Sequence, residues 1–74
     1  MKLSEIQVGK KAKIVAVNGE GKLRDRLLDM GLTPRTIVMI RKKAPLGDPI
    51  EITLRGYELT IRLQEASQIE VEEE

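Results

Sequence analysis

The sequence predicts a mainly β fold, a small five-stranded barrel with one short helix between the first and second strands. Apolar and polar side chains alternate in several short segments, as in strands that turn one face to a core. One segment only, residues 22–30, carries apolar residues at the spacing of a helix face. The chain has 74 residues and short connections, and a small sheet of this kind loses its exposed edges by closing into a barrel.

The first four strands fall into two pairs that differ in how many of their faces are apolar. Residues 10–17 and 36–43 carry apolar side chains on both faces, so we expect both faces of these two strands to be covered. Residues 50–55 and 58–63 alternate most clearly and fit strands with one wet face. An SH3-like barrel accommodates this order. In the competing OB barrel a helix usually lies between the third and fourth elements, where residues 44–49 are too few to form one.

A two-residue hairpin loop is expected between the third and fourth strands. Gly56-Tyr57 fits a type II′ turn, which has glycine at its first central position. The resulting register would place charges opposite unlike charges, threonine opposite threonine and aliphatic opposite aliphatic. The predicted pairs are Arg55–Glu58, Thr53–Thr60, Glu51–Arg62, Leu54–Leu59, Ile52–Ile61 and Ile50–Leu63.

The ends of the chain are expected to complete one domain over residues 1–74. Leu3 to Ile6 fits a single helical turn capped by the Ser4 hydroxyl. A last strand over residues 67–72 should turn Ile69 and Val71 inward. Residues 70–74, four of which are glutamates, are expected to fray as an acidic tail.

The helix carries the first distinctive motif of the chain. Leu23, Leu27 and Met30 lie at positions i, i+4 and i+7 and form its apolar stripe. Gly31 is expected to end the helix, and Leu32 is placed to fold back over its last turn.

The composition argues against an enzyme and against a resident cofactor. Cysteine and histidine are absent, so the chain lacks thiolates, imidazole ligands and the usual general base. No glycine-rich phosphate loop is present. Met30 and Met39 are expected to pack in the core rather than bind metal. The net charge is +1 and Tyr57 is the only aromatic residue, so nucleic-acid binding is not expected. No apolar stretch approaches the roughly 20 residues of a membrane span, and we expect a soluble, cytoplasmic protein.

Protein recognition remains, and two segments are candidates for it. The loop from Ala44 to Pro49 is stiffened by two prolines, and Gly47-Asp48 supplies a tight turn. A loop held in place loses little entropy on docking, although it could equally be a rigid connection. The helix leucines are more often core than interface residues, and Leu28, which lies off the main stripe, is the better candidate for a contact. The partner-binding candidates are Arg24, Leu28, Met30, Leu32, Ala44, Pro45, Leu46, Gly47, Asp48 and Pro49.

These two motifs, together with Arg55-Gly56, resemble the FeoA family over almost the whole chain. The resemblance implies an SH3-like barrel related to the C-terminal barrel of DtxR-type metal-dependent repressors. It implies a cytoplasmic role in bacterial ferrous iron uptake, with the cytosolic GTP-binding part of the membrane transporter FeoB as partner. A monomer or weak homo-oligomer is expected, with no membrane insertion. The alternative is a metal-responsive regulatory domain similar to the repressor barrel.

One position departs from the family pattern. The family commonly has glycine after the proline of the turn that follows the helix, and here Arg35 follows Pro34. A type II turn would place Arg35 at positive φ, which is unfavourable for a residue with a Cβ. We therefore expect a type I turn.

Overall fold

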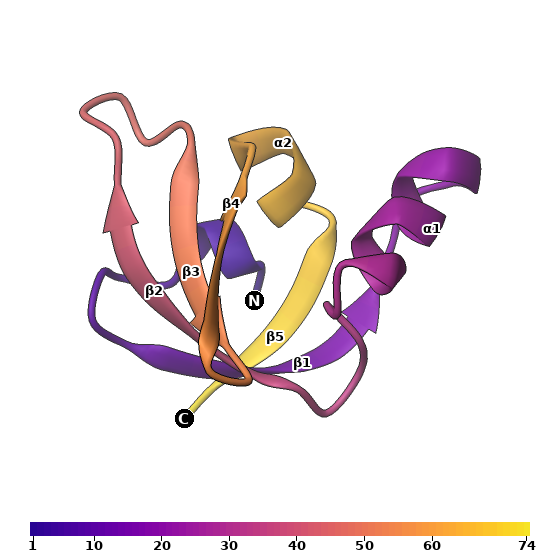
Figure 1. Cartoon of the computed structure of the whole chain (residues 1–74), viewed down its shortest axis with the longest axis horizontal. Helices are drawn as coiled ribbons and strands as arrows, with labels where there is room; N and C mark the ends of the chain where they lie inside the picture. The colour runs from indigo at the N-terminus through magenta and orange to yellow at the C-terminus, as the bar shows by residue number, and fades with distance from the viewer.

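The five strands form one curled antiparallel sheet in the order β4-β3-β2-β1-β5 (Figure 1). The computed structural model describes all residues, 1–74. Three helical pieces accompany the sheet, and the main helix α1 lies between the first and second strands as expected. The elements are a 3₁₀ turn η1 (Leu3–Glu5), β1 (Lys11–Val17), α1 (Gly21–Asp29), β2 (Ile37–Lys43), β3 (Ile50–Leu54), β4 (Tyr57–Ile61), α2 (Leu63–Ala66) and β5 (Ile69–Glu73). The mainly β, SH3-like fold is confirmed.

The core fills the concave side of this sheet. Sixteen buried aliphatic residues form one cluster, and eleven of them come from the inward positions of the strands. Leu27 of α1, Leu3 and Ile6 at the N-terminus, Leu32 and Ala66 close the cluster from outside the sheet. Ile69 and Val71 of β5 face inward, as predicted.

The expectation that β1 and β2 are covered on both faces is wrong. Each strand buries one face, and the apolar residues Val15 and Ile37 remain 46% and 40% exposed. The pairing of β1 with β5 also shifts between Ile14 and Ala16. This bulge turns Val17 into the core beside Ile14, although strict alternation would place the two side chains on opposite faces.

The C-terminus of α1 is built as the sequence predicts. Gly31 has φ +97°, its N–H donates to Leu28 O at 3.0 Å, and the N–H of Leu32 donates to Leu27 O at 3.1 Å. These two bonds form a Schellman motif, in which a left-handed residue satisfies the last carbonyls of a helix. Leu32 folds back and is fully buried.

The turn after α1 differs from its prediction. The N–H of Thr36 donates to Thr33 O at 3.2 Å, so the turn is present, but Arg35 has φ +77°. The expected type I turn is therefore wrong, since a positive φ at this position is the mark of a type II turn. The N–H of Arg35 donates to Ile14 O at 2.7 Å, and this bond to β1 holds the residue in the unfavourable region.

The hairpin between β3 and β4 has another turn and register than predicted. The loop is Arg55-Gly56, with φ +48° and +84°, which fits a type I′ turn rather than type II′. The strands pair Leu54 with Tyr57 and Thr53 with Glu58, a shift of two residues that leaves the side chains of residues 50–61 on their predicted faces. The predicted pair Ile50–Leu63 is wrong, because Ile50 pairs with Ile61, and Leu63 begins α2 and is 40% exposed. Arg41 of β2 contacts the carboxylates of Glu51 and Glu58 at 3.3 and 3.4 Å. Glu51 and Glu58 thus form ion pairs with Arg41 of β2 rather than with the basic residues of the hairpin.

Both chain ends are more ordered than the sequence suggests. Residue 2, not Ser4, caps η1, and the N–H of Lys2 donates to Glu5 Oε1 at 2.6 Å. The expected frayed tail is wrong, because β5 pairs with β1 up to Glu73 and the N–H of Glu74 donates to Lys11 O at 3.0 Å. The N–H of Val71 donates to Met1 O at 2.7 Å, so the N-terminus covers the outer edge of β5.

Candidate functional site

The side chains do not gather into a metal-type cluster. No group of three or more His, Cys, Asp or Glu residues lies close enough together to hold a metal ion. Every buried side-chain nitrogen or oxygen has a hydrogen-bond partner. No helix combines the length and apolar character of a membrane crossing. The surfaces on which the candidate residues lie are therefore the features to compare.

Most of the candidates on and after α1 are used inside the fold. Leu32 is fully buried, and Leu28 and Met30 are partly buried against the core cluster. The Nε of Arg24 donates to Val17 O at 3.2 Å and ties α1 to the end of β1. This segment offers the partly exposed sides of Leu28 and Met30, with Arg24 beside them, as its contact surface.

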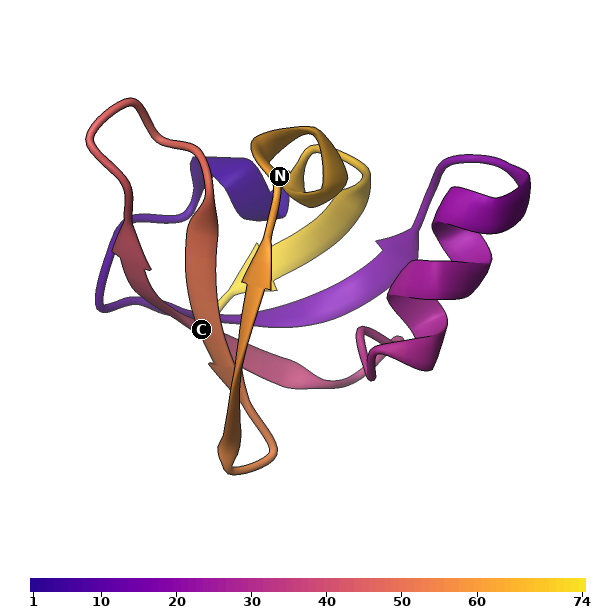
Figure 2. The same cartoon turned by 45° about the horizontal axis from the view of Figure 1, so that its top comes forward.

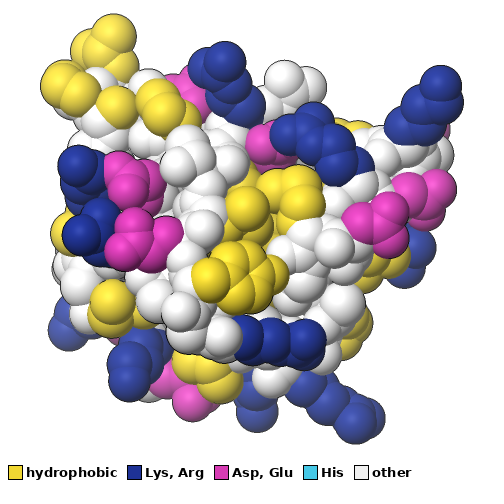
Figure 3. Space-filling view, in the orientation of Figure 1, with side chains coloured by type: hydrophobic (Ala, Val, Ile, Leu, Met, Phe, Trp, Pro, Cys, Tyr) yellow, Lys and Arg dark blue, Asp and Glu magenta, His cyan; other side chains and the backbone are white.

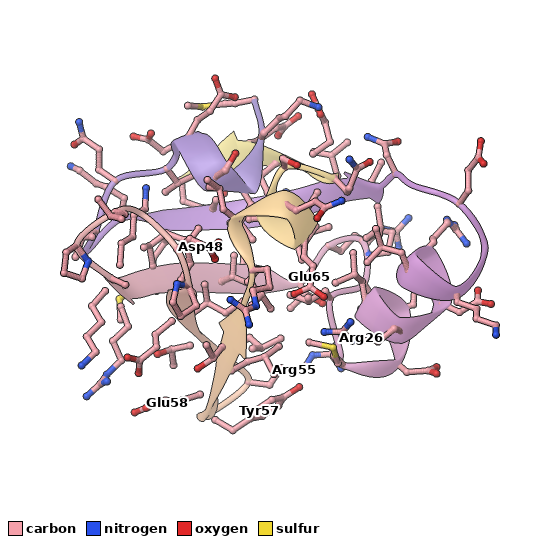
Figure 4. All side chains as sticks on the ribbon, turned by 90° about the horizontal axis from the view of Figure 1, so that it is seen from above. Arg26, Asp48, Arg55, Tyr57, Glu58 and Glu65 are labelled. Carbon is pink, nitrogen blue, oxygen red and sulfur yellow. The ribbon has the colours of Figure 1, made fainter.

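The β3–β4 hairpin closes against the end of α1. The hydroxyl of Tyr57 donates to Met30 O at 2.6 Å, directly over Gly31. A Cβ at Gly31 would lie 2.6 Å from that hydroxyl, so the glycine is required by contact as well as by its φ. Arg55 Nη2 donates to Thr36 Oγ1 at 3.0 Å, and Figure 4 shows Arg55 and Tyr57 at the hairpin end nearest α1.

A buried carboxylate joins the two helices. Glu65 on α2 is 5% exposed, and its carboxylate lies 2.5 Å from Arg26 Nη2 of α1. The same carboxylate accepts a hydrogen bond from the N–H of Arg62 at 2.8 Å. Figure 4 shows Arg26 and Glu65 pointing toward each other. The pair fixes α1 relative to α2, and the sequence analysis did not single it out.

The loop from Ala44 to Pro49 is held by its own bonds and presents one bare side chain. The N–H of Ala44 donates to Pro49 O at 3.0 Å, and the N–H of Gly47 donates to Ala44 O at 2.7 Å. Asp48 Oδ1 accepts from the N–H of Leu63 at 3.0 Å and caps the start of α2. Leu46 is 93% exposed at the tip. The tight turn is thus centred on Pro45 and Leu46 rather than on Gly47-Asp48 as expected, and Leu46 is its exposed side chain.

The structure does not bring the two candidate segments together. The loop from Ala44 to Pro49 projects at the upper left, whereas α1 lies at the far right, in both views of the fold (Figures 1 and 2). Apolar side chains also stand at the upper left of the space-filling view (Figure 3). The candidates therefore form two separate surfaces.

A third surface was missed by the sequence analysis. The convex face of the sheet has a hollow of about 350 Å³. Its sequence signal is the pair of apolar residues Ile37 and Met39 at alternate positions of β2. The expectation that Met39 packs in the core is wrong, because Met39 is half-buried on the convex face and lines the hollow. The lining residues of the hollow are Lys11, Ile37, Val38, Met39, Thr53, Leu54 and Arg55.

A family model described as the FeoA domain matches residues 1–73. The chain belongs to the FeoA family. A curated relative, the Fe(2+) transport protein A/Fe(2+) transporter FeoB fusion protein of Porphyromonas gingivalis, is 39% identical over 72 residues. The match covers 97% of this chain and 8% of the relative, so the chain spans only a small part of that protein. The FeoA family is associated with ferrous iron transport, and this relative is a fusion of a FeoA protein with the transporter FeoB.

Solved structures of FeoA proteins share the fold. The FeoA-like protein from Clostridium acetobutylicum is 41% identical with a TM-score of 0.91, covering 99% of this chain and 85% of that one. The zinc complex of Stenotrophomonas maltophilia FeoA, described as an SH3 domain protein, is 24% identical with a TM-score of 0.86 and covers 97% and 89%.

The barrel is also similar to part of a metal-dependent repressor. A manganese-dependent transcriptional repressor in complex with manganese gives a TM-score of 0.91 at 10% identity, over all of this chain and 36% of that chain. At this identity the likeness shows the fold alone.

Proposed function

We propose that this FeoA protein is a non-enzymatic, cytoplasmic accessory protein of ferrous iron uptake that docks on the cytosolic GTP-binding part of a FeoB-like transporter and modulates it. The observation that carries the proposal is Leu46, a large apolar side chain presented at 93% exposure on a loop fixed by three hydrogen bonds. The fusion of the two proteins in the Porphyromonas gingivalis relative supports the choice of partner.

The loop has the physical properties of a docking element. Its backbone is already held, so docking orders few additional degrees of freedom. Burying a leucine that is almost fully exposed contributes about 1.5–3 kcal/mol of hydrophobic free energy. Pro45 stands beside Leu46 and is also exposed. In this proposal Arg24, Leu28 and Met30 form a second, weaker contact on the opposite side of the molecule.

The proposal assigns no resident cofactor to this chain. Ferrous iron is the cargo of the transporter, and the accessory protein acts by contact with it. The carboxylates that are fixed in the structure serve the fold, as Glu65 and Asp48 do.

A binding titration tests the proposal. The purified cytosolic domain of the transporter made by the same cell is titrated with this protein in the GTP-bound, GDP-bound and nucleotide-free states. We expect measurable binding in at least one state, weakened about tenfold by Leu46→Ser. Val8→Ser is the matched control, because Val8 is 53% exposed and lies outside the candidate surfaces. Absence of binding in every nucleotide state would overturn the proposal.

A second candidate function is a metal-responsive regulatory domain, the alternative that the sequence leaves open for a barrel with this fold. It differs from the first in requiring direct binding of the ion. Anaerobic titration of the protein with Fe(II), followed by calorimetry, distinguishes the two. A dissociation constant tighter than about 1 mM would favour the regulatory domain, whereas weaker binding is what scattered surface carboxylates give.

A further inference from the structure

The convex face of β1 and β2 carries apolar side chains that nothing in the molecule covers. Val15 and Ile37 are 46% and 40% exposed, and Met39 is half-buried beside them. Strands with apolar residues on both faces are ordinarily covered on both. Here the core occupies the concave side, and no helix packs on the other.

This face is hollowed at its centre. Met39 lies between Lys11 of β1 and Thr53 of β3 in the strand register. Thr53 is short and its neighbours Met39 and Arg55 are long, so the surface dips between them into the hollow of about 350 Å³. A side chain of another protein could fill such a depression, whereas a flat surface would bridge it.

The hollow is bordered by cations without ionic partners. Lys11 and Arg55 line it on opposite sides, and Lys13 is the register partner of Ile37. None of the ion pairs in the structure includes these three residues. Arg55 donates to the neutral hydroxyls of Thr33 and Thr36, which orient its guanidinium and leave its charge uncompensated. Lysine and arginine side chains gather along the lower border of Figure 3, below the strand β1 of Figure 1.

The acidic groups nearest the hollow do not line it, although Glu58 is the register partner of Thr53, and they differ in their pairing. Glu51 and Glu58 are engaged by Arg41, and Lys42 also contacts Glu51 at 3.4 Å. Glu72 of β5 is the register partner of Lys13 and forms no ion pair with it. The centre of the convex face therefore has an apolar floor with positive borders, while its two outer strands carry carboxylates.

We propose that the convex face formed by Val15, Ile37 and Met39, with Lys11, Lys13 and Arg55 around it, binds an amphipathic protein segment whose apolar side chains are flanked by carboxylates. Apolar residues would fill the hollow, and the carboxylates would meet the unpaired cations. The inference rests on the proposed function only for the identity of the protein that carries the segment, the transporter.

Two other occupants fit this face less well. An anionic membrane would be repelled by Glu58 and Glu72 on the outer strands, and a flat lipid surface leaves the hollow empty. A second copy of the chain placed face to face would set lysine against lysine. A single narrow segment avoids both conflicts.

The first experiment uses synthetic peptides and does not involve the transporter. A helical peptide with a leucine stripe flanked by glutamates is titrated into protein carrying ¹³C-labelled Met and Ile methyl groups. We expect the methyl signals of Met39 and Ile37 to shift, and the counterpart peptide with lysine in place of glutamate to bind at least about tenfold more weakly. Equal binding of the two peptides, or shifts confined to other methyl groups, would overturn the inference.

Variants separate charge from apolar contact in the same titration. Lys11→Gln with Lys13→Gln should weaken binding of the acidic peptide about fivefold, because the β1 border of the hollow loses both of its charges. Lys10→Gln with Lys22→Gln, both exposed away from the hollow, is the matched control. Ile37→Thr should weaken binding similarly, with Val8→Thr as control. Phosphatidylglycerol vesicles that bind where the peptide does not, or self-association seen by sedimentation, would overturn the inference in favour of a lipid surface or a second copy.

The second experiment adds the transporter's cytosolic domain. If the domain binds and Leu46→Ser weakens it while the Lys11 and Lys13 double variant does not, the proposed function stands and this inference fails. If the domain does not bind but the acidic peptide does, the proposed function fails and the inference that the convex face binds an acidic amphipathic segment stands.

Discussion

The two motif segments, residues 23–32 and 44–49, make opposite use of their apolar side chains. In the first, Leu27 and Leu32 are fully buried, and Gly31 lies under the Tyr57 hydroxyl. In the second, the backbone is held by the fold but Leu46 stands 93% exposed. Residues of a family motif can therefore either stabilise the fold or present a contact residue to a partner, and only their burial in the structure distinguishes the two.

The strongest test of this comparison is Leu32→Ala. Leu32 is fully buried where the Schellman motif folds back onto α1. Removing its side chain should lower the free energy of unfolding by about 2–5 kcal/mol through lost burial and the cavity left behind. Urea denaturation followed by circular dichroism measures this. A loss below about 1 kcal/mol would mean that the segment does not anchor the core.

The glycines of the two segments give a matched pair. Gly31 and Gly47 have φ of +97° and +81°, so alanine is strained at both positions. A Cβ at Gly31 meets the Tyr57 hydroxyl at 2.6 Å, whereas one at Gly47 meets nothing within 4 Å. Gly47→Ala should cost about 1 kcal/mol and Gly31→Ala about 2–4 kcal/mol.

The Tyr57 contact itself can be isolated by a double-mutant cycle. In a Tyr57→Phe background the hydroxyl is gone, so the additional cost of Gly31→Ala should shrink toward that of Gly47→Ala. Chemical denaturation of the single and double variants provides the energies. Strictly additive effects would show that the hydroxyl does not press on Gly31.

A smaller effect of opposite sign is expected between the two segments. Arg35 is exposed at φ +77°, and its backbone N–H is held by Ile14 O. Arg35→Gly relieves the left-handed strain at the cost of a more flexible unfolded chain, for a net stabilisation of about 0.5–1 kcal/mol. The melting temperature should rise. Arg35→Ala keeps the Cβ and should bring no such gain.

The smallest change in stability is expected at the exposed tip. Leu46→Ala removes a side chain that contacts almost nothing in the fold, so the free energy of unfolding should stay within about 0.5 kcal/mol of the parent. Thermal denaturation of this variant beside Leu32→Ala makes the comparison direct. A loss comparable to that of Leu32→Ala would place Leu46 in the core and remove it as a docking residue.

The hairpin shows where sequence reasoning about this fold stops. The alternation in residues 50–63 predicts both strands, and the structure confirms the strands and the burial of Ile50, Ile52, Leu54 and Ile61, whereas Leu63 begins α2 and is exposed. The register was inferred from charges within the hairpin alone. In the structure Arg41 of β2 takes Glu51 and Glu58, and the Tyr57 hydroxyl bonds to Met30 O. The observed turn and register therefore occur together with contacts from β2 and from the end of α1, which the sequence of the hairpin alone does not contain.

The candidate surfaces divide in the same way. The proline and glycine pattern predicts a rigid loop from Ala44 to Pro49, and its hydrogen bonds bear out that shape. The apolar residues Ile37 and Met39 looked like core because a strand pattern does not tell which of two apolar faces the rest of the chain will cover. The hollow between Lys11 and Arg55 depends on three neighbouring strands.

The sequence by itself determined the strand segments, the helix and its glycine end, because these follow from the spacing of apolar residues and the φ that glycine permits. It also determined the family, through two motifs at fixed separation. The tertiary structure alone decided the hairpin register, the left-handed Arg35, the order of the acidic C-terminus and the uncovered convex face. Each of these depends on a partner distant in the chain, and local pattern carries no information about such partners.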